Sequence, residues 1–231
     1  MGKLLVQEKE IVVPGQELAD GMDYLPGEDT CRDKDKVLAM RVGIVNIVGR
    51  LVKLTALTGP YIPKRGDLVI GDIVNVGIGG WRVNIDWPFE ANLSVKEATS
   101  DFVNKGADLS RYFDYGDYVI AQIINVAGTK IIDLSMKGPG LRKLGPGRLI
   151  KIPPSKVPRV IGKQASMINM IKDYTGCKIS VGQNGVVWLS GEDPKKEALA
   201  VRVLNKIIDE SHIPGLTERV KEFLERGKNG L

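Results

Sequence analysis

The stretch KVPRVIGKQASMINMIKDYTGCKISVGQNG, residues 156–185, decides the fold of the C-terminal part of the chain. Pro158 suits the first turn of a short helix, because its missing N–H would lack a partner there anyway, and Gly162 ends that helix. A second helix is predicted from about residue 165 and ends at Gly176. Its buried face has the i, i+3, i+4, i+7 spacing of a single stripe: Met167, Met170, Ile171 and Tyr174.

Two predicted strands follow the helices, at 177–181 and 186–190, and Gly182-Gln183-Asn184-Gly185 joins them. Because Asn-Gly is a preferred pair in tight hairpins, we expect Gly182, Asn184 and Gly185 to form a structural turn. A phosphate-binding loop is the weaker interpretation, since the run does not open a helix and no Lys-Ser/Thr pair follows it.

The complete pattern over residues 148–212 is strand–helix–helix–strand–strand–helix. Arg148–Ile152 gives the first strand, and Asp193-Pro194 caps the last helix. This order resembles the type I K-homology (KH) domain, which clamps a nucleotide backbone on a GXXG loop. The loop here reads Gly162-Lys163-Gln164-Ala165, so a Cβ replaces the second glycine. The resemblance implies the KH fold with an altered clamp.

Size and composition allow two or three small domains, with 231 residues of which 43% are hydrophobic. No apolar run reaches the ~18–20 residues of a membrane span, and the N-terminus lacks the apolar core of a secretion signal. Cys31 and Cys177 lie far apart, which suits a reducing compartment. We therefore expect a cytoplasmic protein with no membrane partner.

Positive charge is concentrated in the KH-like part of the chain. The net charge is +5 overall, and residues 141–212 carry an excess of basic residues while residues 1–140 carry a slight excess of acidic ones. Such an excess is expected where a domain meets phosphates. The alternative is a solvated face on a lysine-rich protein.

Residues 1–60 are predicted to form a small β-domain. Strand-like segments lie at 37–48 and 51–57, joined at Gly49-Arg50, and Pro14-Gly15 marks an earlier turn. Residues 18–36 are polar, so we expect a long loop there, which either docks on a partner or is disordered.

Residues 61–137 contain five strand candidates separated by turns, which suits a small closed barrel, the OB-fold. The candidates are 67–76, 81–86, 89–93, 118–126 and 131–136. The phrases GDLVIGDIVNV and YGDYVIAQIINV resemble the S1 motif, an OB-fold repeat that holds single-stranded RNA with aromatic and basic side chains. This chain departs from many S1 motifs, because Val76 and Ile78 stand where aromatics are frequent. The glycine-rich segment 138–147 is expected to be a linker.

The expected RNA contacts are basic residues near predicted turns, together with one tryptophan and the first glycine of the KH loop. They are Lys64, Arg65, Trp81, Arg82, Lys130, Lys156, Arg159, Gly162 and Lys163. Trp81 is equally compatible with the barrel core. With a single histidine, His212, and scattered acidic residues, the sequence suggests no catalytic residue, metal site or cofactor.

The order of parts is β-domain (1–60), S1 barrel (61–137), linker (138–147), KH domain (148–212) and terminal helix (213–231). With the motifs PGQEL, VPRVIGK and GQNG, this mainly β plus α+β multidomain chain is similar to the S1/KH cap subunits of the archaeal exosome. The resemblance implies a non-catalytic subunit that guides single-stranded RNA 3′ ends into a ring.

The resemblance also implies that three cap subunits bind a hexameric phosphorolytic ribonuclease ring. Residues 1–60 would then supply the contact with that ring. Whether a second cap protein shares the ring is left open. Two rivals remain. One is a free-standing RNA-binding protein in translation or ribosome assembly. The other is a nuclease with accessory S1 and KH domains, which ranks last because such enzymes carry a large catalytic domain ahead of them.

Overall fold

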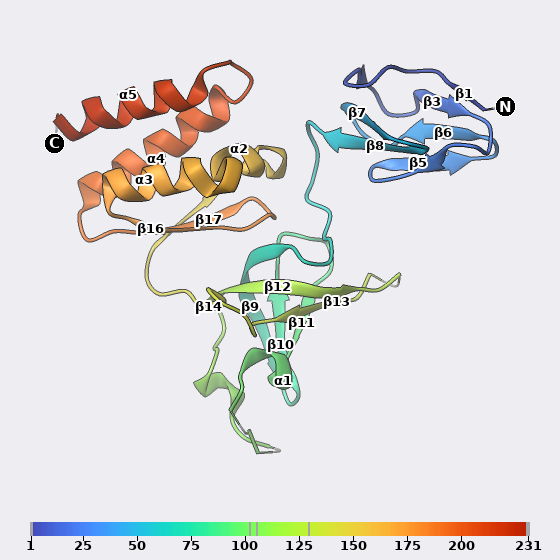
Figure 1. Cartoon of the computed structure of the whole chain (residues 1–231). Coiled ribbons are helices and arrows are strands. Elements are labelled where there is room, and N and C mark those ends of the chain that lie inside the picture. Colours follow the sequence, from blue (N-terminus) through green and yellow to red (C-terminus); the bar gives the residue numbers. More distant parts are fainter. Residues whose placement is uncertain (1, 102, 105, 129, 230–231) are drawn as a thin grey trace. The chain divides into compact units, whose positions relative to one another are not determined.

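The computed structural model describes residues 2–101, 103–104, 106–128 and 130–229, and the chain divides into two compact units at Pro60/Tyr61 (Figure 1). Each unit has its own hydrophobic core. In the described part of the chain, no helix has both the length and the apolar character needed to cross a membrane.

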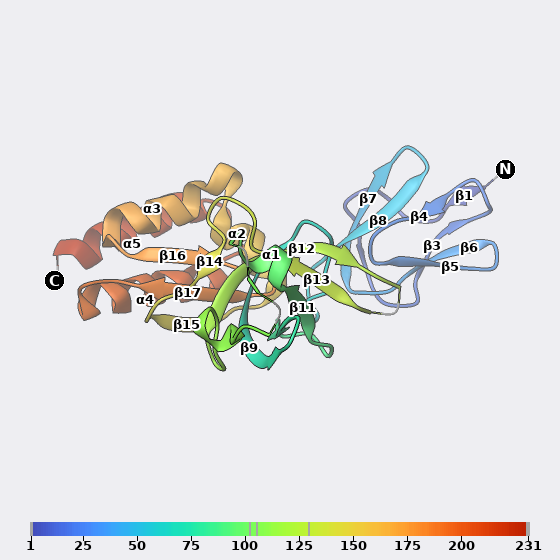
Figure 2. The same ribbon diagram turned by 90° about the horizontal axis from the view of Figure 1, so that it is seen from below.

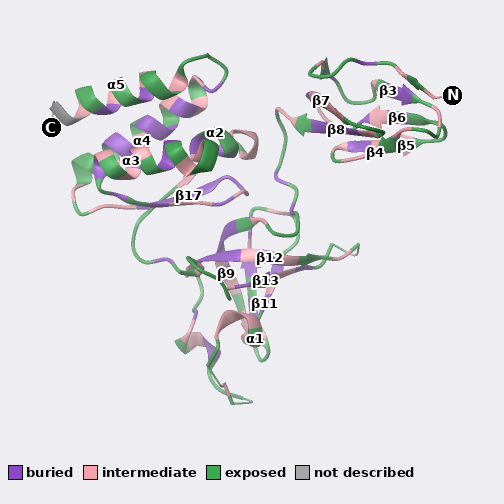
Figure 3. Cartoon of the chain, in the orientation of Figure 1, coloured by how far each residue is buried: buried purple, intermediate pink, exposed green. Residues whose placement is uncertain are grey.

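The N-terminal unit is built from two four-stranded sheets, with strand orders β1-β3-β6-β5 and β2-β7-β8-β4. The strands are β1 Lys3–Leu4, β2 Ile11–Val12, β3 Glu17–Asp20, β4 Leu25–Pro26, β5 Thr30–Asp33, β6 Lys36–Ala39, β7 Gly43–Val48 and β8 Leu51–Ala56. The expected long loop over residues 18–36 is wrong, because β3, β4 and β5 lie there. Leu18 and Ala19 of β3 and Thr30 of β5 are buried, and Figure 3 shows buried segments in this unit in purple.

Residues 61–137 form the predicted closed barrel. The sheet order is β13-β11-β10-β9-β12, and pairing of β12 with β13 closes it. Its strands are β9 Leu68–Gly77, β10 Gly80–Asn84, β11 Ala91–Ser94, β12 Tyr118–Val126 and β13 Ile132–Ser135. The short helices α1 Val95–Ala98 and η1 Leu109–Arg111 lie in the connection between β11 and β12.

The segment 138–147 is more than a connector. Strand β14, Arg142–Lys143, pairs with β12 and extends the barrel sheet, and Leu144 is buried. Leu144 packs with Ile70 and Ile120 of the barrel and with Val186 and Trp188 of the KH domain. The segment thus contributes to the junction of the two domains.

The KH domain has the predicted type I order, with three antiparallel strands arranged β15-β17-β16. Its elements are β15 Arg148–Lys151, η2 Pro154–Lys156, α2 Val157–Ile161, η3 Lys163–Ala165, α3 Ser166–Thr175, β16 Lys178–Val181, β17 Val186–Ser190 and α4 Pro194–Asp209. The terminal helix α5, Leu216–Asn229, packs on α3 and α4 through Val220 and Leu224 (Figures 1 and 2).

Strand β17 presents different neighbours on its two faces. Val187 and Leu189 face the helical core, whereas Val186 and Trp188 pack against the barrel. The alternation of side chains along a strand makes this possible. The central strand of the KH sheet is therefore buried between the KH helices and the barrel.

The turn between β16 and β17 attaches the KH domain to the barrel through the Asn184 carboxamide. Asn184 Nδ2 donates to the carbonyl oxygens of Ile70 at 2.8 Å and Ile85 at 3.1 Å, and Asn184 Oδ1 accepts from the Ile70 N–H at 3.3 Å. Beside it, the Gln183 N–H donates to Leu68 O at 2.7 Å, and Gln183 Oε1 accepts from the Leu68 N–H. The turn therefore forms hydrogen bonds with Leu68 and Ile70, in the first part of β9. Pairing of β9 with β10 begins only at Asp72.

The glycines of this turn are required by close approach. A Cβ at Gly182 would lie 2.3 Å from Asn184 Oδ1, and one at Gly185, where φ is +83°, would lie 2.2 Å from Ile152 O. Asn184 itself is only 4% exposed. Gly182 and Asn184 therefore lie at the contact with the barrel, and Gly185 packs within the KH domain. The buried Asn184 side chain is not accessible to a phosphate.

Lys151 and Asp86 form a second link between the domains, with Lys151 Nζ 2.8 Å from an Asp86 carboxylate oxygen. The hydrogen bond that Lys151 donates to the Asp86 carboxylate raises the pKa of Lys151. Both side chains are substantially exposed, so this pair contributes little stability compared with the buried Asn184 contacts.

Candidate nucleic-acid interface

A polar ladder crosses the outer face of the barrel over β10, β11, β13 and β12. Arg82 lies opposite Asn92 and donates to its Oδ1, and Asn92 Nδ2 donates to Asp133 Oδ1 at 3.5 Å. Asn125 Nδ2 donates to the other Asp133 oxygen at 3.0 Å. The side chains of Arg82, Asn92 and Asp133 point outward because their strand neighbours fill the barrel core. The ladder holds the Arg82 guanidinium on the surface.

An exposed aromatic ring lies beside this ladder. Phe89 is 44% exposed, and Lys130 Nζ lies 5.1 Å from its ring centroid. A hollow of about 380 Å³ lies beside the ring and is lined by Arg82, Pro88, Phe89, Glu90, Asn92, Lys130 and Ile131. An exposed ring with a lysine against it and an arginine in the same hollow can stack a nucleobase while the two cations attract its phosphates. The structure thus brings together two predicted contacts, Arg82 and Lys130.

Phe89 was missed by the sequence reasoning. It follows Trp87-Pro88, which interrupts the strand pattern, and it was assigned only to the start of the next strand. In the structure that strand begins at Ala91, so Phe89 lies in the connection before it. The available signal was an aromatic residue directly after a strand-breaking proline on an OB-fold, where such rings serve as stacking surfaces.

Trp81 is not available to stack a base. Its side chain is 2% exposed, its Nε1–H donates to Phe113 O at 2.9 Å, and its ring meets the Phe113 ring edge-on at 5.0 Å. The strand alternation that turns Arg82 outward turns Trp81 into the core. The expectation that Trp81 contacts RNA is therefore withdrawn.

Lys64 and Arg65 lie in the exposed turn that precedes β9. The Gly66 N–H donates to Ile123 O at 2.7 Å, which holds the turn against β12. Neither Lys64 nor Arg65 lines the hollow beside Phe89. The structure therefore separates these two predicted contacts from Arg82 and Lys130.

The KH loop forms a second candidate surface. Arg159, Gly162 and Lys163 line a hollow of about 500 Å³ whose other wall is the connection at 211–218. Lys156 lies one turn earlier, at the junction of η2 and α2, and does not line the hollow. Gly162 has φ +76°, and a Cβ there would lie 2.7 Å from the Met167 Cβ, so glycine is needed for the turn itself.

Ala165 occupies the position where a GXXG loop has its second glycine, and its backbone is left-handed, with φ 60° and ψ 19°. An alanine in this region costs about 1–2 kcal/mol relative to a right-handed conformation. We expect Ala165→Gly to raise the free energy of unfolding by about 0.5–1 kcal/mol, because the relieved strain exceeds the extra chain entropy. Urea unfolding measures the change.

A matched control separates this effect from the general cost of glycine. Ala198→Gly, at an exposed position within helix α4, is expected to lower stability by about 1 kcal/mol. Opposite signs for the two alanine-to-glycine changes support strain at Ala165. A loss of similar size at both positions would contradict it.

Comparison with known proteins agrees with the geometry. A KH domain family model matches residues 148–206. Exosome complex component Rrp4 of Thermococcus kodakarensis is 44% identical over 228 residues, which span 97% of this chain and 88% of that protein. Exosome complex component Rrp4 of Methanothermus fervidus is 45% identical over 224 residues, which span 96% of this chain and 98% of that protein. The chain belongs to the Rrp4 family.

A solved structure supports membership of the Rrp4 family at the level of the fold. A crystal structure described as a candidate exosome complex RNA-binding protein matches with a TM-score of 0.66 and 36% identity, covering 74% of this chain and 98% of that one. The family resemblance and the fold class predicted from the sequence are thereby confirmed.

In this Rrp4-family chain, the described residues include no group of three or more histidine, cysteine, aspartate or glutamate side chains arranged to hold a metal ion. The charged residues of the hollow beside Phe89 are Arg82, Lys130 and Glu90, and Asp133 of the adjoining ladder accepts from two amides. What this arrangement offers a ligand is stacking and charge.

Proposed function

We propose that the chain is a non-catalytic, RNA-binding subunit of the archaeal exosome, which caps the nuclease ring and guides single-stranded RNA 3′ ends into it. The observation that carries the proposal is similarity along nearly the whole chain to proteins named exosome complex component Rrp4. The cation-flanked Phe89 on the barrel supplies a surface on which a strand of RNA would lie.

The physical chemistry of this surface suits a guide. Arginine and lysine attract phosphates without reading the base sequence, and an aromatic ring stacks on any base. A strand held in this way can slide along while its end is consumed elsewhere. Three such surfaces around one pore would raise the local concentration of RNA above what a single weak site achieves.

The N-terminal unit carries apolar side chains that its own core leaves exposed, which supports its proposed role in contact with the ring. They are Ile11, Val13, Met22, Leu25, Met40 and Val48. In this proposal the cap is a trimer on a hexameric phosphorolytic ring, and the assembly works in the cytoplasm.

A degradation assay tests the division of labour. Labelled oligo(A) RNA is incubated with the purified chain, with ring subunits, and with both together. We expect intact RNA with the chain alone and faster phosphate-dependent shortening when the chain joins the ring. Degradation by the chain alone, persisting through repurification, would contradict the non-catalytic role.

A further inference from the structure

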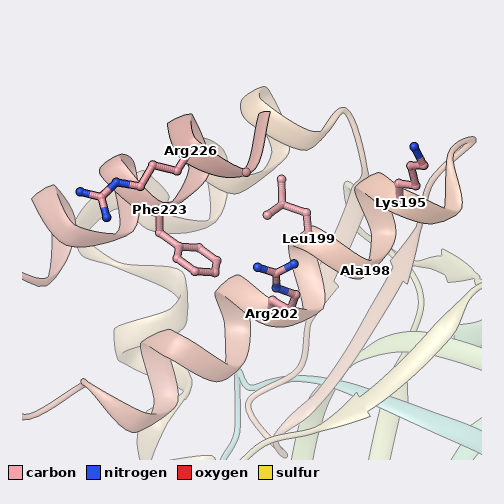
Figure 4. Close-up of a pocket in the computed structure, with 7 residues that line it drawn as sticks. Lys195, Ala198, Leu199, Arg202, Phe223 and Arg226 are labelled. Carbon is pink, nitrogen blue, oxygen red and sulfur yellow. The ribbon is translucent and has the colours of Figure 1, made fainter. Parts of the chain in front are cut away.

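A groove between α4 and α5 is unrelated to the proposed RNA surfaces. It has a volume of about 520 Å³ and is lined by residues of both helices (Figure 4): Lys195, Ala198, Leu199, Arg202, Phe223, Arg226 and Gly227. It shares no lining residue with the hollow at the KH loop or with the hollow beside Phe89. It is therefore a separate surface with chemistry of its own.

The floor of the groove is apolar and closely built. Leu199 and the partly buried Phe223 form it, and Gly227 lets α5 approach α4, since a Cβ there would lie 2.5 Å from Leu199 Cδ1. Glycine within a helix costs about 1 kcal/mol relative to alanine. The close approach it permits brings the last turns of α5 against the first turns of α4.

The rim of the groove carries a surplus of positive charge. Lys195, Arg202 and Arg226 all line the groove, and Figure 4 shows Arg202 between Leu199 and Phe223, with Lys195 and Arg226 toward its two ends. Among the described residues, neither Lys195 nor Arg202 has a carboxylate within salt-bridge distance, and Arg226 has only the exposed Glu222 at 3.9 Å. Clustered cations with few carboxylate partners favour a ligand that brings carboxylates or phosphates.

The ring in the groove argues for a peptide over RNA. Arg202 and Lys206 of α4 already lie against Phe223, each 5.4 Å from the ring centroid. No other aromatic residue lines the groove. Phe223 is also partly buried in the helical core, unlike the exposed Phe89, so its ring offers little free face on which a base would stack. An aliphatic floor between two helices instead suits one large apolar side chain of a peptide.

We propose that the α4–α5 groove docks a short acidic segment of a partner protein. One leucine or phenylalanine of that segment packs on Leu199 and Phe223, and flanking carboxylates meet Lys195, Arg202 and Arg226. The groove thus gives the chain a protein-recruiting surface apart from its proposed RNA path.

The test uses the full chain and a fluorescein-labelled peptide, EDEELEEFEEDE, followed by fluorescence anisotropy. The variant Lys195→Glu/Arg226→Glu changes two lining residues, and Lys196→Glu/Lys221→Glu makes the same charge change on the same two helices outside the groove. We expect at least tenfold weaker binding for the first pair and less than threefold for the second. Circular dichroism confirms that both variants are folded.

Two further measurements use the unmodified chain: binding of a peptide without its apolar residues, and competition with oligo(A). A peptide with serine in place of its leucine and phenylalanine should bind at least tenfold more weakly, because the apolar anchor is gone. Equal losses for both charge pairs, equal binding of the serine peptide, or absence of saturable binding would overturn the proposal. Displacement of the peptide by an equal concentration of oligo(A) would overturn it in favour of RNA.

Discussion

Replacing Asn184 with alanine is expected to lower the free energy of unfolding by about 3 kcal/mol, because three buried backbone groups lose their partner. Those groups are the Ile70 N–H, Ile70 O and Ile85 O, which lie 99 or more residues away in the sequence. Urea unfolding followed by tryptophan fluorescence reports the change, since Trp188 packs at the same junction.

Two companion variants sharpen this prediction. Asn184→Asp keeps the shape of the side chain but turns a carboxylate toward two carbonyl oxygens, so it should destabilise at least as much as alanine. Asn205→Ala, at an exposed position of α4, should change stability by less than about 0.5 kcal/mol. A loss under 1 kcal/mol for Asn184→Ala would show that the junction does not depend on this carboxamide.

The largest expected effect on ligand binding is at the barrel face. Phe89→Ala should weaken binding of oligo(A) about tenfold, because losing one stacked base costs about 1–3 kcal/mol. Arg82→Glu/Lys130→Glu should weaken binding further and reduce the slope of log K against log salt by about 1.4, since each phosphate contact contributes about 0.7. Anisotropy titrations at several salt concentrations measure both quantities.

Controls for this prediction use residues away from the hollow. Tyr115→Ala removes an exposed aromatic that does not line it, and Lys196→Glu/Lys221→Glu matches the charge change. Both should leave oligo(A) affinity within about threefold of the unmodified chain. If these controls lose as much affinity as the variants at Phe89, Arg82 and Lys130, then net charge or exposed surface, and not this site, binds RNA.

Local patterns in the sequence were enough to predict the barrel and the KH domain. Helical spacing located α3, and the Asn-Gly pair located the turn before β17. The same local patterns could not show what Asn184 contacts, because its partners Ile70 and Ile85 lie in a different domain. Long-range hydrogen bonds leave no periodic signal.

The remaining errors have similar physical causes. Strands β3 and β5 have four residues each and place charged residues on their exposed side, so residues 18–36 looked like a loop. Strand β14 is two residues long, and glycine and proline around it suggested a linker. At Trp81 the signal was present, because it alternates with Val83 and Ile85, which also fill the core.

The mass of the native assembly purified from its own cells tests the central claim most directly. The account predicts that this 25.2 kDa chain is recovered as a cap subunit. The complex should contain six nuclease-ring subunits and three cap subunits in all. Native mass spectrometry would then detect this chain only as part of that assembly. Recovery as a free monomer, or with ribosomal particles and no ring subunits, would contradict the account.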